Sequence, residues 1–116
     1  MIVATTEYIA GRRTLRTLGQ CYGLVVRSRG LGGNFMAQLR SIVGGEIPEY
    51  TQLLEDARRH AVDRMVKSAA HMGANAILCM RFGGTEVAMS MTEIVAYGTA
   101  AVIEDIGIAE NPVELA

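Results

Sequence analysis

Four residues of this sequence have side chains that bind soft or borderline metal ions: Cys21, Cys79, His60 and His71. Cysteine thiolates and neutral imidazole nitrogens are the usual protein ligands for zinc and copper. The sequence contains no CxxC pair and no HExxH motif, the spacings that bring such ligands onto one ion. We therefore regard these residues as candidate ligands for a divalent or soft metal ion, in a site where ligands from several subunits meet on a symmetry axis.

Each of the four residues also has a simpler interpretation. Cys79 alternates with Ile77 and Arg81, which is typical of a small buried residue in a strand. His60 and His71 share one face of a predicted helix but lie about 16 Å apart along it, too far to hold one ion within a chain. The two cysteines are distant in sequence, and we predict that they are reduced thiols of a cytoplasmic protein.

Nucleophilic catalysis needs a cysteine or serine beside a base and an orienting group. The two histidines lie on a charged helix face, whereas the cysteines lie in predicted strands, and no GxSxG motif is present. We therefore predict that the protein is not an enzyme. An enzyme with a pocket between subunits remains the alternative.

Arginine and tyrosine side chains supply the candidate ligand-binding groups. Arg27 and Arg29 flank a turn and could hold a phosphate or carboxylate with paired hydrogen bonds, or pair with acids across an interface. Tyr50, at the start of a helix, could line a pocket at a subunit boundary or simply satisfy its hydroxyl group there. The glycine-rich segment 30–34 fits neither GxGxxG nor the Walker A pattern, so we interpret it as a strand-to-helix turn.

Length and charge exclude several classes of protein. The chain has 116 residues, of which 50% are hydrophobic, enough for one domain with its own core. Its formal net charge of −1 lacks the basic excess of a nucleic-acid binder. The sequence shows neither a signal-peptide pattern nor an apolar run of membrane-spanning length. We expect a cytoplasmic protein with no nucleic-acid or membrane partner.

Hydrophobic periodicity predicts an α+β fold with a small mixed or antiparallel sheet. We expect a long helix at 48–72, because Ala57, Ala61, Met65 and Ala69 recur at helical spacing. A glycine pair at 83–84 predicts a turn between two strands. The remaining expected elements are a short helix at 35–43 and strands at 1–5, 14–27, 76–82 and 87–103.

One long helix cannot cover both faces of such a sheet. The strands carry Val25, Ile77, Ile94 and Val102, and we expect these side chains to lie on faces that the helix leaves uncovered. A second copy of the chain is the simplest cover, so we predict a homo-oligomer.

The glycine-rich blocks of the sequence resemble the YbjQ-like family, small bacterial and archaeal proteins to which heavy-metal binding is ascribed. The resemblance covers about residues 1–104, which we take as one domain, with 105–116 as a loose C-terminal tail. The residues that carry it include Gly44 and Gly45, then Gly73, Ala74, Asn75 and Ala76, and finally Gly98 and Thr99.

This resemblance implies a dodecin-like α+β subunit that assembles into a ring, a pentamer or a decamer. It carries over no cysteine or histidine motif, and the segment Glu46-Ile47-Pro48 departs from the basic and small residues of the family. We expect a non-enzymatic homo-oligomer that binds a heavy-metal ion or a small ligand at subunit boundaries. The alternatives are a ring-forming scaffold without a ligand and an enzyme with an interfacial pocket.

Overall fold

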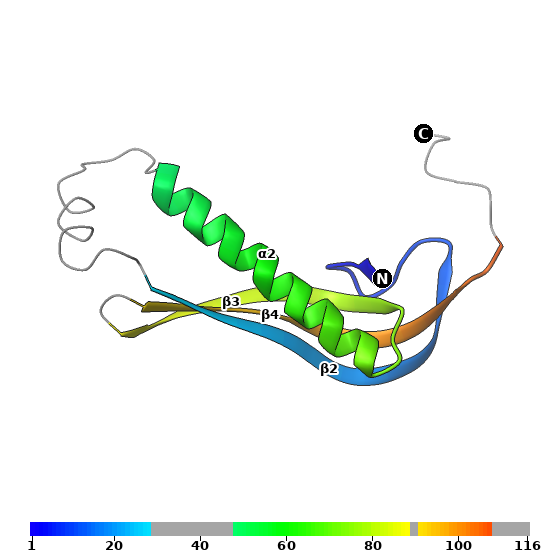
Figure 1. Cartoon of the computed structure of the whole chain (residues 1–116). Coiled ribbons are helices and arrows are strands. Elements are labelled where there is room, and N and C mark those ends of the chain that lie inside the picture. Colours follow the sequence, from blue (N-terminus) through cyan, green and yellow to red (C-terminus); the bar gives the residue numbers. More distant parts are fainter. Residues whose placement is uncertain (29–47, 89–90, 108–116) are drawn as a thin grey trace.

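The computed structural model of the chain describes residues 1–28, 48–88 and 91–107. These residues form an α+β fold in which a four-stranded sheet packs against one helix (Figure 1). The strand order is β1-β3-β4-β2, with β1 parallel to β3 and the other pairs antiparallel, so the predicted mixed sheet is confirmed. The elements are β1 (Ile2–Val3), β2 (Arg12–Ser28), α2 (Pro48–His71), β3 (Ala76–Ala88) and β4 (Met91–Asp105).

Some predicted segments lie outside the described residues. The short helix at 35–43 and the glycines Gly44 and Gly45 are among them. The strand β4 continues to Asp105, one residue past the predicted domain boundary, and most of the predicted tail, residues 108–116, is also outside.

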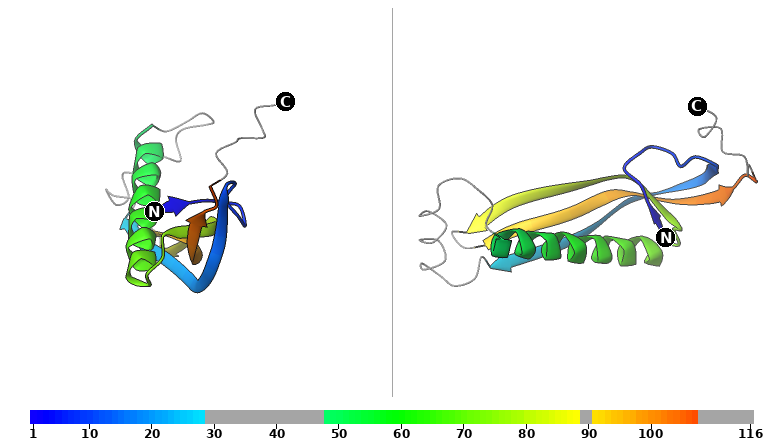
Figure 2. Two further views of the ribbon diagram at one scale, coloured as in Figure 1. Left: turned by 90° about the vertical axis from the view of Figure 1, so that its right-hand side faces the viewer. Right: turned by 90° about the horizontal axis from the view of Figure 1, so that it is seen from above.

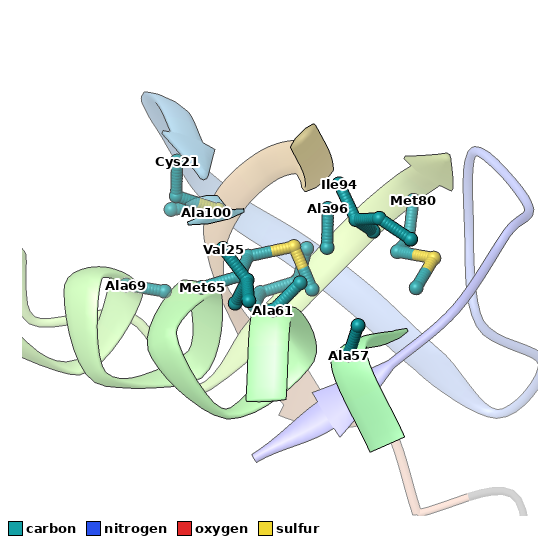
Figure 3. Packing of buried hydrophobic residues seen from close by; sticks show 11 residues of the cluster. Cys21, Val25, Ala57, Ala61, Met65, Ala69, Met80, Ile94, Ala96 and Ala100 are labelled. Carbon is teal, nitrogen blue, oxygen red and sulfur yellow. The ribbon is translucent and has the colours of Figure 1, made fainter. Parts of the chain in front are cut away.

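The helix α2 follows the prediction within one residue at its C-terminal end. Ala57, Ala61, Met65 and Ala69 are fully buried, and they form the contact surface with the sheet (Figure 3). Small alanine side chains let the helix backbone approach the strands closely. No helix in the described part of the chain is long and apolar enough to cross a membrane.

A left-handed glycine ends the helix. Gly73 has a φ of 89°, and its backbone N–H donates to the carbonyl of Ala70 while that of Ala74 donates to the carbonyl of Ala69. This pair of bonds is a Schellman motif, which satisfies two helix carbonyls that would otherwise lack partners.

The closest contact between helix and sheet occurs at Gly23 of β2. A Cβ atom placed there would lie 2.1 Å from the carbonyl oxygen of Ala61 and 2.4 Å from the backbone nitrogen of Met65. Both atoms belong to the helix backbone, so neither can move without shifting α2. Glycine at this position therefore sets how deeply the helix sits on the sheet.

Two predicted strand boundaries were wrong. β3 runs through Gly83 and Gly84 without a turn and ends at Ala88, since both glycines pair with β4. The expected strand at 1–5 is regular only over Ile2–Val3, although Ala4 and Thr6 still exchange backbone hydrogen bonds with β3. A glycine pair can also lie inside a strand, and here the partner strand β4 forms hydrogen bonds with the backbone around Gly83 and Gly84.

One sheet face is not covered by the helix, as predicted, but the residues that were expected on that face do not lie there. Val25, Ile77 and Ile94 are buried beneath α2, and Val102 is half-buried. The helix lies against one face of the sheet only (Figure 2). The alternate residues of the strands lie on the opposite face, where Leu78, Ala101 and Ile103 are buried and others are exposed. Exposed side chains of that set are Tyr22, Leu24, Val26 and Tyr97.

The strands β2 and β4 extend past the C-terminal end of α2, where β2 curves sharply (Figure 1). Their register shifts between Thr14 and Arg16 and again between Thr17 and Gly19, whose φ is 123°. Such irregularities are β-bulges, which bend a strand.

We expect the substitution Gly23→Ala to destabilise the protein by about 3 kcal/mol, because the added methyl group meets helix backbone rather than a flexible side chain. Chemical denaturation measures the difference. Gly84→Ala is the matched control, since its added carbon would lie 3.6 Å from the carbonyl oxygen of Glu93, an ordinary contact. Equal stability of the two variants would show that the helix position is not set at Gly23.

Candidate functional site

The fold brings together two of the predicted site residues: Arg27, a candidate ligand-binding residue, and His60, a candidate metal ligand. Arg27 lies near the end of β2 on the helix side of the sheet, and its guanidinium group contacts Nδ1 of His60 on α2. Arg27 is half-buried and His60 is exposed. Since a guanidinium group only donates hydrogen bonds, Nδ1 is the acceptor, and the proton of neutral His60 is on Nε2.

A third residue, Arg64, extends this cluster along the helix. It follows His60 by one helical turn, and its guanidinium nitrogen donates a 2.6 Å hydrogen bond to the carbonyl oxygen of Leu24. Among the described residues, no carboxylate forms an ion pair with Arg27 or Arg64. Sequence analysis did not single out Arg64, although its spacing of four from His60 was the available signal.

The Nε atom of Arg27 is buried and has no hydrogen-bond partner in the described structure. The half-buried guanidinium group of Arg27 carries a positive charge that no carboxylate among the described residues pairs with. A divalent cation on His60 would lie beside this charge, which is an unfavourable arrangement. The Arg27, His60 and Arg64 cluster is therefore suited to anions and not to metal ions.

Two other residues predicted to bind ligands cannot be placed in this cluster. Arg29 lies outside the described residues, as does the side chain of Tyr50, whose backbone forms part of the first turn of α2.

The two cysteines are both free and lie on opposite sides of β4. Cys21 of β2 pairs with Gly98, and the register of β3 places Cys79 and Met80 opposite the same glycine. Two strand spacings separate the cysteines by about 10 Å, beyond the reach of a disulfide. The prediction of free thiols is confirmed.

Cys21 belongs to the hydrophobic core. Its side chain is 1% exposed, and its thiol contacts the carbonyl oxygen of Gly98 at 3.6 Å. Burial raises the pKa of the Cys21 thiol above the ordinary value of 9.0, because the thiolate loses its hydration. A metal ion needs the thiolate form, so this environment opposes metal binding at Cys21.

Cys79 forms a β-bulge in β3. It has a φ of 55°, in the left-handed region, and its backbone N–H donates to the carbonyl of Thr6. Two residues of β3 here oppose Gly98 alone, and a Cβ atom on that glycine would lie 2.7 Å from Cγ2 of Ile77 and 2.9 Å from the carbonyl oxygen of Leu78. Gly98 is therefore required by the bulge. Its neighbour Thr99 is half-buried and pairs with Leu78.

The predicted metal ligands do not gather. His71 is exposed in the last turn of α2, where a basic group interacts favourably with the helix C-terminus, and Cys79 is half-buried on a different element. In the described part of one chain, no three His, Cys, Asp or Glu side chains lie where they could hold an ion.

Asn75, in the block Gly73-Ala74-Asn75-Ala76 that follows the helix, forms hydrogen bonds to β4. Its side-chain amide donates to the carbonyl oxygen of Ile103 at 2.9 Å and accepts from the backbone N–H of Ile103 at 2.8 Å. The amide thus pairs with β4 as a strand residue would, just before Ala76 begins β3. In this block Gly73 ends the helix and Asn75 binds the backbone of β4.

A shallow groove of about 410 Å³ lies between α2 and β3, on the side away from the Arg27 cluster. Its charges are mostly matched, because Arg59 pairs with Asp56 at 3.0 Å and with Glu55 at 3.8 Å. Arg58 lies over the Phe82 ring, 4.7 Å from its centre. This groove does not favour one class of ligand.

Comparison with known proteins identifies the class to which this fold and these motifs belong. Residues 1–104 match the YbjQ family, described as "Putative heavy-metal-binding". The chain belongs to this family.

Relatives occur in both bacteria and archaea. A UPF0145 protein of Bradyrhizobium sp. (strain ORS 278) is 70% identical over 104 residues, covering 90% of this chain and 94% of the relative. A UPF0145 protein of the archaeon Picrophilus torridus is 53% identical over 111 residues, covering 96% of this chain and 94% of the relative.

A solved structure supports the fold. The crystal structure of a protein of unknown function from Pediococcus pentosaceus, of the DUF74 family, aligns with a TM-score of 0.56 at 16% identity. The alignment covers 90% of this chain and 98% of that one. The heavy-metal description of the YbjQ family does not fit the described residues of a single chain, which gather no set of metal ligands.

We expect Asn75→Ala to lower the free energy of unfolding by about 1–2 kcal/mol, because the backbone of Ile103 loses both side-chain partners. Asn75→Asp keeps the acceptor oxygen and should fall between this variant and the unsubstituted protein. Urea denaturation measures all three. Full stability of Asn75→Ala would mean that water replaces the amide without cost.

The buried thiol of Cys21 predicts an alkaline loss of stability. The folded chain holds this proton more tightly than the unfolded chain, so the free energy of unfolding falls as the pH rises above 9.0. We expect Cys21→Ala to reduce this slope, measured by denaturation on either side of that pH. Cys79→Ala is the control and should retain the slope. An unchanged slope in Cys21→Ala would contradict the assignment.

Proposed function

We propose that this protein is a non-enzymatic homo-oligomer whose copies pack through the open face of the sheet and bind a heavy-metal ion or a small ligand at subunit boundaries. The open face is the observation that carries this proposal. The described residues of one chain gather no set of metal ligands that would be complete in a single copy.

Apolar side chains line the open face in adjacent rows. Tyr22 of β2 lies directly opposite Tyr97 of β4, and the two are 55% and 42% exposed. The next residues along β2 on the same face are Leu24 and Val26, at 40% and 50% exposure. A contiguous patch of aromatic and aliphatic side chains is typical of a protein–protein interface.

The outer edge of β2 supports the same conclusion. Among the described residues this strand pairs only with β4, so its other side carries backbone groups without a neighbouring strand. A long edge with apolar side chains on one face favours association with another chain. Tyr22, Leu24 and Val26 belong to this edge strand, and their side chains lie on the open face.

The candidate metal ligands lie far apart on different elements of one chain, and this supports binding at subunit boundaries. His71 is exposed at the helix end and Cys79 is half-buried in β3, so neither completes a metal site within the described chain. A heavy-metal site would therefore need ligands from more than one subunit. The family description supports this ligand class, and the two free thiols support a cytoplasmic location.

A ring is the form of assembly that we propose, as a pentamer or a decamer. A scaffold without a ligand and an enzyme with a pocket between subunits are the competing functions. The scaffold would be purified without a bound ion or small molecule. The enzyme would have a cleft in which reactive residues of adjacent chains meet.

We expect untagged protein, purified without chelator, to appear in native mass spectrometry as an oligomer carrying the mass of a bound ion or small molecule. An oligomer that stays without added mass after incubation with zinc, copper and nickel salts would support the scaffold instead. A monomer would contradict the proposal.

The open face is tested with Leu24→Glu, which places a charge among the apolar side chains and should shift the protein to monomers. The matched control is Ala70→Glu, which adds the same charge at an exposed position of α2. Assembly of Leu24→Glu to the normal mass, with a normal circular dichroism spectrum, would show that subunits associate through another surface.

A further inference from the structure

We propose that Arg27, His60 and Arg64 form a binding site for a phosphate group, carried by free phosphate or by a small phosphate monoester. All three residues belong to one chain, so the site does not depend on the assembly proposed above. It also lies apart from the candidate metal ligands His71 and Cys79.

The charge of Arg27 is the first argument. This residue is half-buried between β2 and α2, and its described partner is the uncharged ring nitrogen of His60. Its Nε atom is buried without a partner. A guanidinium group in this position has lost part of its hydration, and no carboxylate among the described residues pairs with it, so a bound anion would be stabilised beside it.

The three side chains present donors and no free acceptor. Arg27 donates to Nδ1 of His60, which leaves Nε2–H of His60 as a donor. Arg64 uses one guanidinium nitrogen for the carbonyl of Leu24 and retains its others. A set made up only of N–H donors matches the acceptor oxygens of a phosphate and repels metal cations.

The spacing of the residues suits a small anion. His60 and Arg64 are one helical turn apart on α2, about 6 Å along its axis. Their partners on β2, Arg27 and Leu24, are three residues apart and run in the opposite direction to the helix. His60 and Arg64 thus lie on neighbouring turns of one helix, and we infer that the long Arg27 and Arg64 side chains reach one phosphate group between them.

The local charge balance favours an anion even though the whole chain is slightly acidic. Of the acidic helix residues nearest in sequence, Asp63 lines the groove on the other side of α2, and Asp56 pairs with Arg59 at 3.0 Å. No carboxylate among the described residues pairs with Arg27 or Arg64.

Isothermal titration calorimetry of the intact, untagged protein with inorganic phosphate tests the site, in chloride buffer of constant ionic strength. Glycerol phosphate is the second titrant, and it distinguishes a monoester site from one for free phosphate. We expect measurable binding of at least one of them and a higher melting temperature in its presence. The absence of both effects would overturn the proposal.

Arg64→Gln is the main variant, because Arg64 is exposed and its loss leaves the core intact. We expect it to weaken phosphate binding by about tenfold or more, since it removes charge-assisted hydrogen bonds. Arg27→Gln should have at least the same effect. If that half-buried substitution disturbs folding, as judged by circular dichroism, Arg64→Gln still decides the question.

Two matched controls separate a built site from general attraction to a basic surface. Arg59→Gln and Lys67→Gln each remove one positive charge from exposed positions of the same helix. Both should bind phosphate within about twofold of the unsubstituted protein, because neither residue belongs to the cluster. Equal weakening in all variants would mean that the helix attracts anions only diffusely. Tighter binding of a single-stranded oligonucleotide than of phosphate would also overturn the assignment.

Discussion

The contact between the backbone of α2 and Gly23 of β2 is the constraint on which the rest of the structure depends. No side chain separates the helix from the strand at this point, and a Cβ atom would lie 2.1 Å from the carbonyl oxygen of Ala61. The helix therefore sits low over β2, with Ala57, Met65 and Ala69 sealed against the sheet (Figure 3). Alanines predominate on the helix side of this core, while Met65, Ile77 and Ile94 supply its larger side chains.

The position of α2 over β2 determines which residues meet on each side of the helix. Because α2 lies over β2, Arg27 of that strand meets His60, and Arg64 reaches the carbonyl of Leu24. On the other side, a shallow groove with matched charges separates the helix from β3. On the opposite face of the sheet, the region around Tyr22, Leu24, Val26 and Tyr97 is left exposed, and its apolar side chains carry the proposal of assembly.

The motifs that identify the family have structural roles wherever the structure describes them. Gly73 ends the helix, Asn75 pairs with the backbone of β4, and Gly98 accommodates the bulge at Cys79. The two proposals therefore look for chemical function elsewhere, in surface residues outside these motifs or in several chains together. A charged cluster such as Arg27, His60 and Arg64 does the former, whereas the heavy-metal description of the family would require the latter.

The sequence by itself determined the α+β class, the bounds of α2 and its buried alanine stripe, because these follow from local periodicity and from end signals such as Gly73. It also predicted that one sheet face is open. Only the tertiary structure decided which face, since alternation along a strand gives two sets of residues without saying which one meets the helix. The same holds for the meeting of Arg27 with His60, which depends on how α2 and β2 align across the interface. Side chains far apart in the chain are brought together by packing, and packing has no local signature.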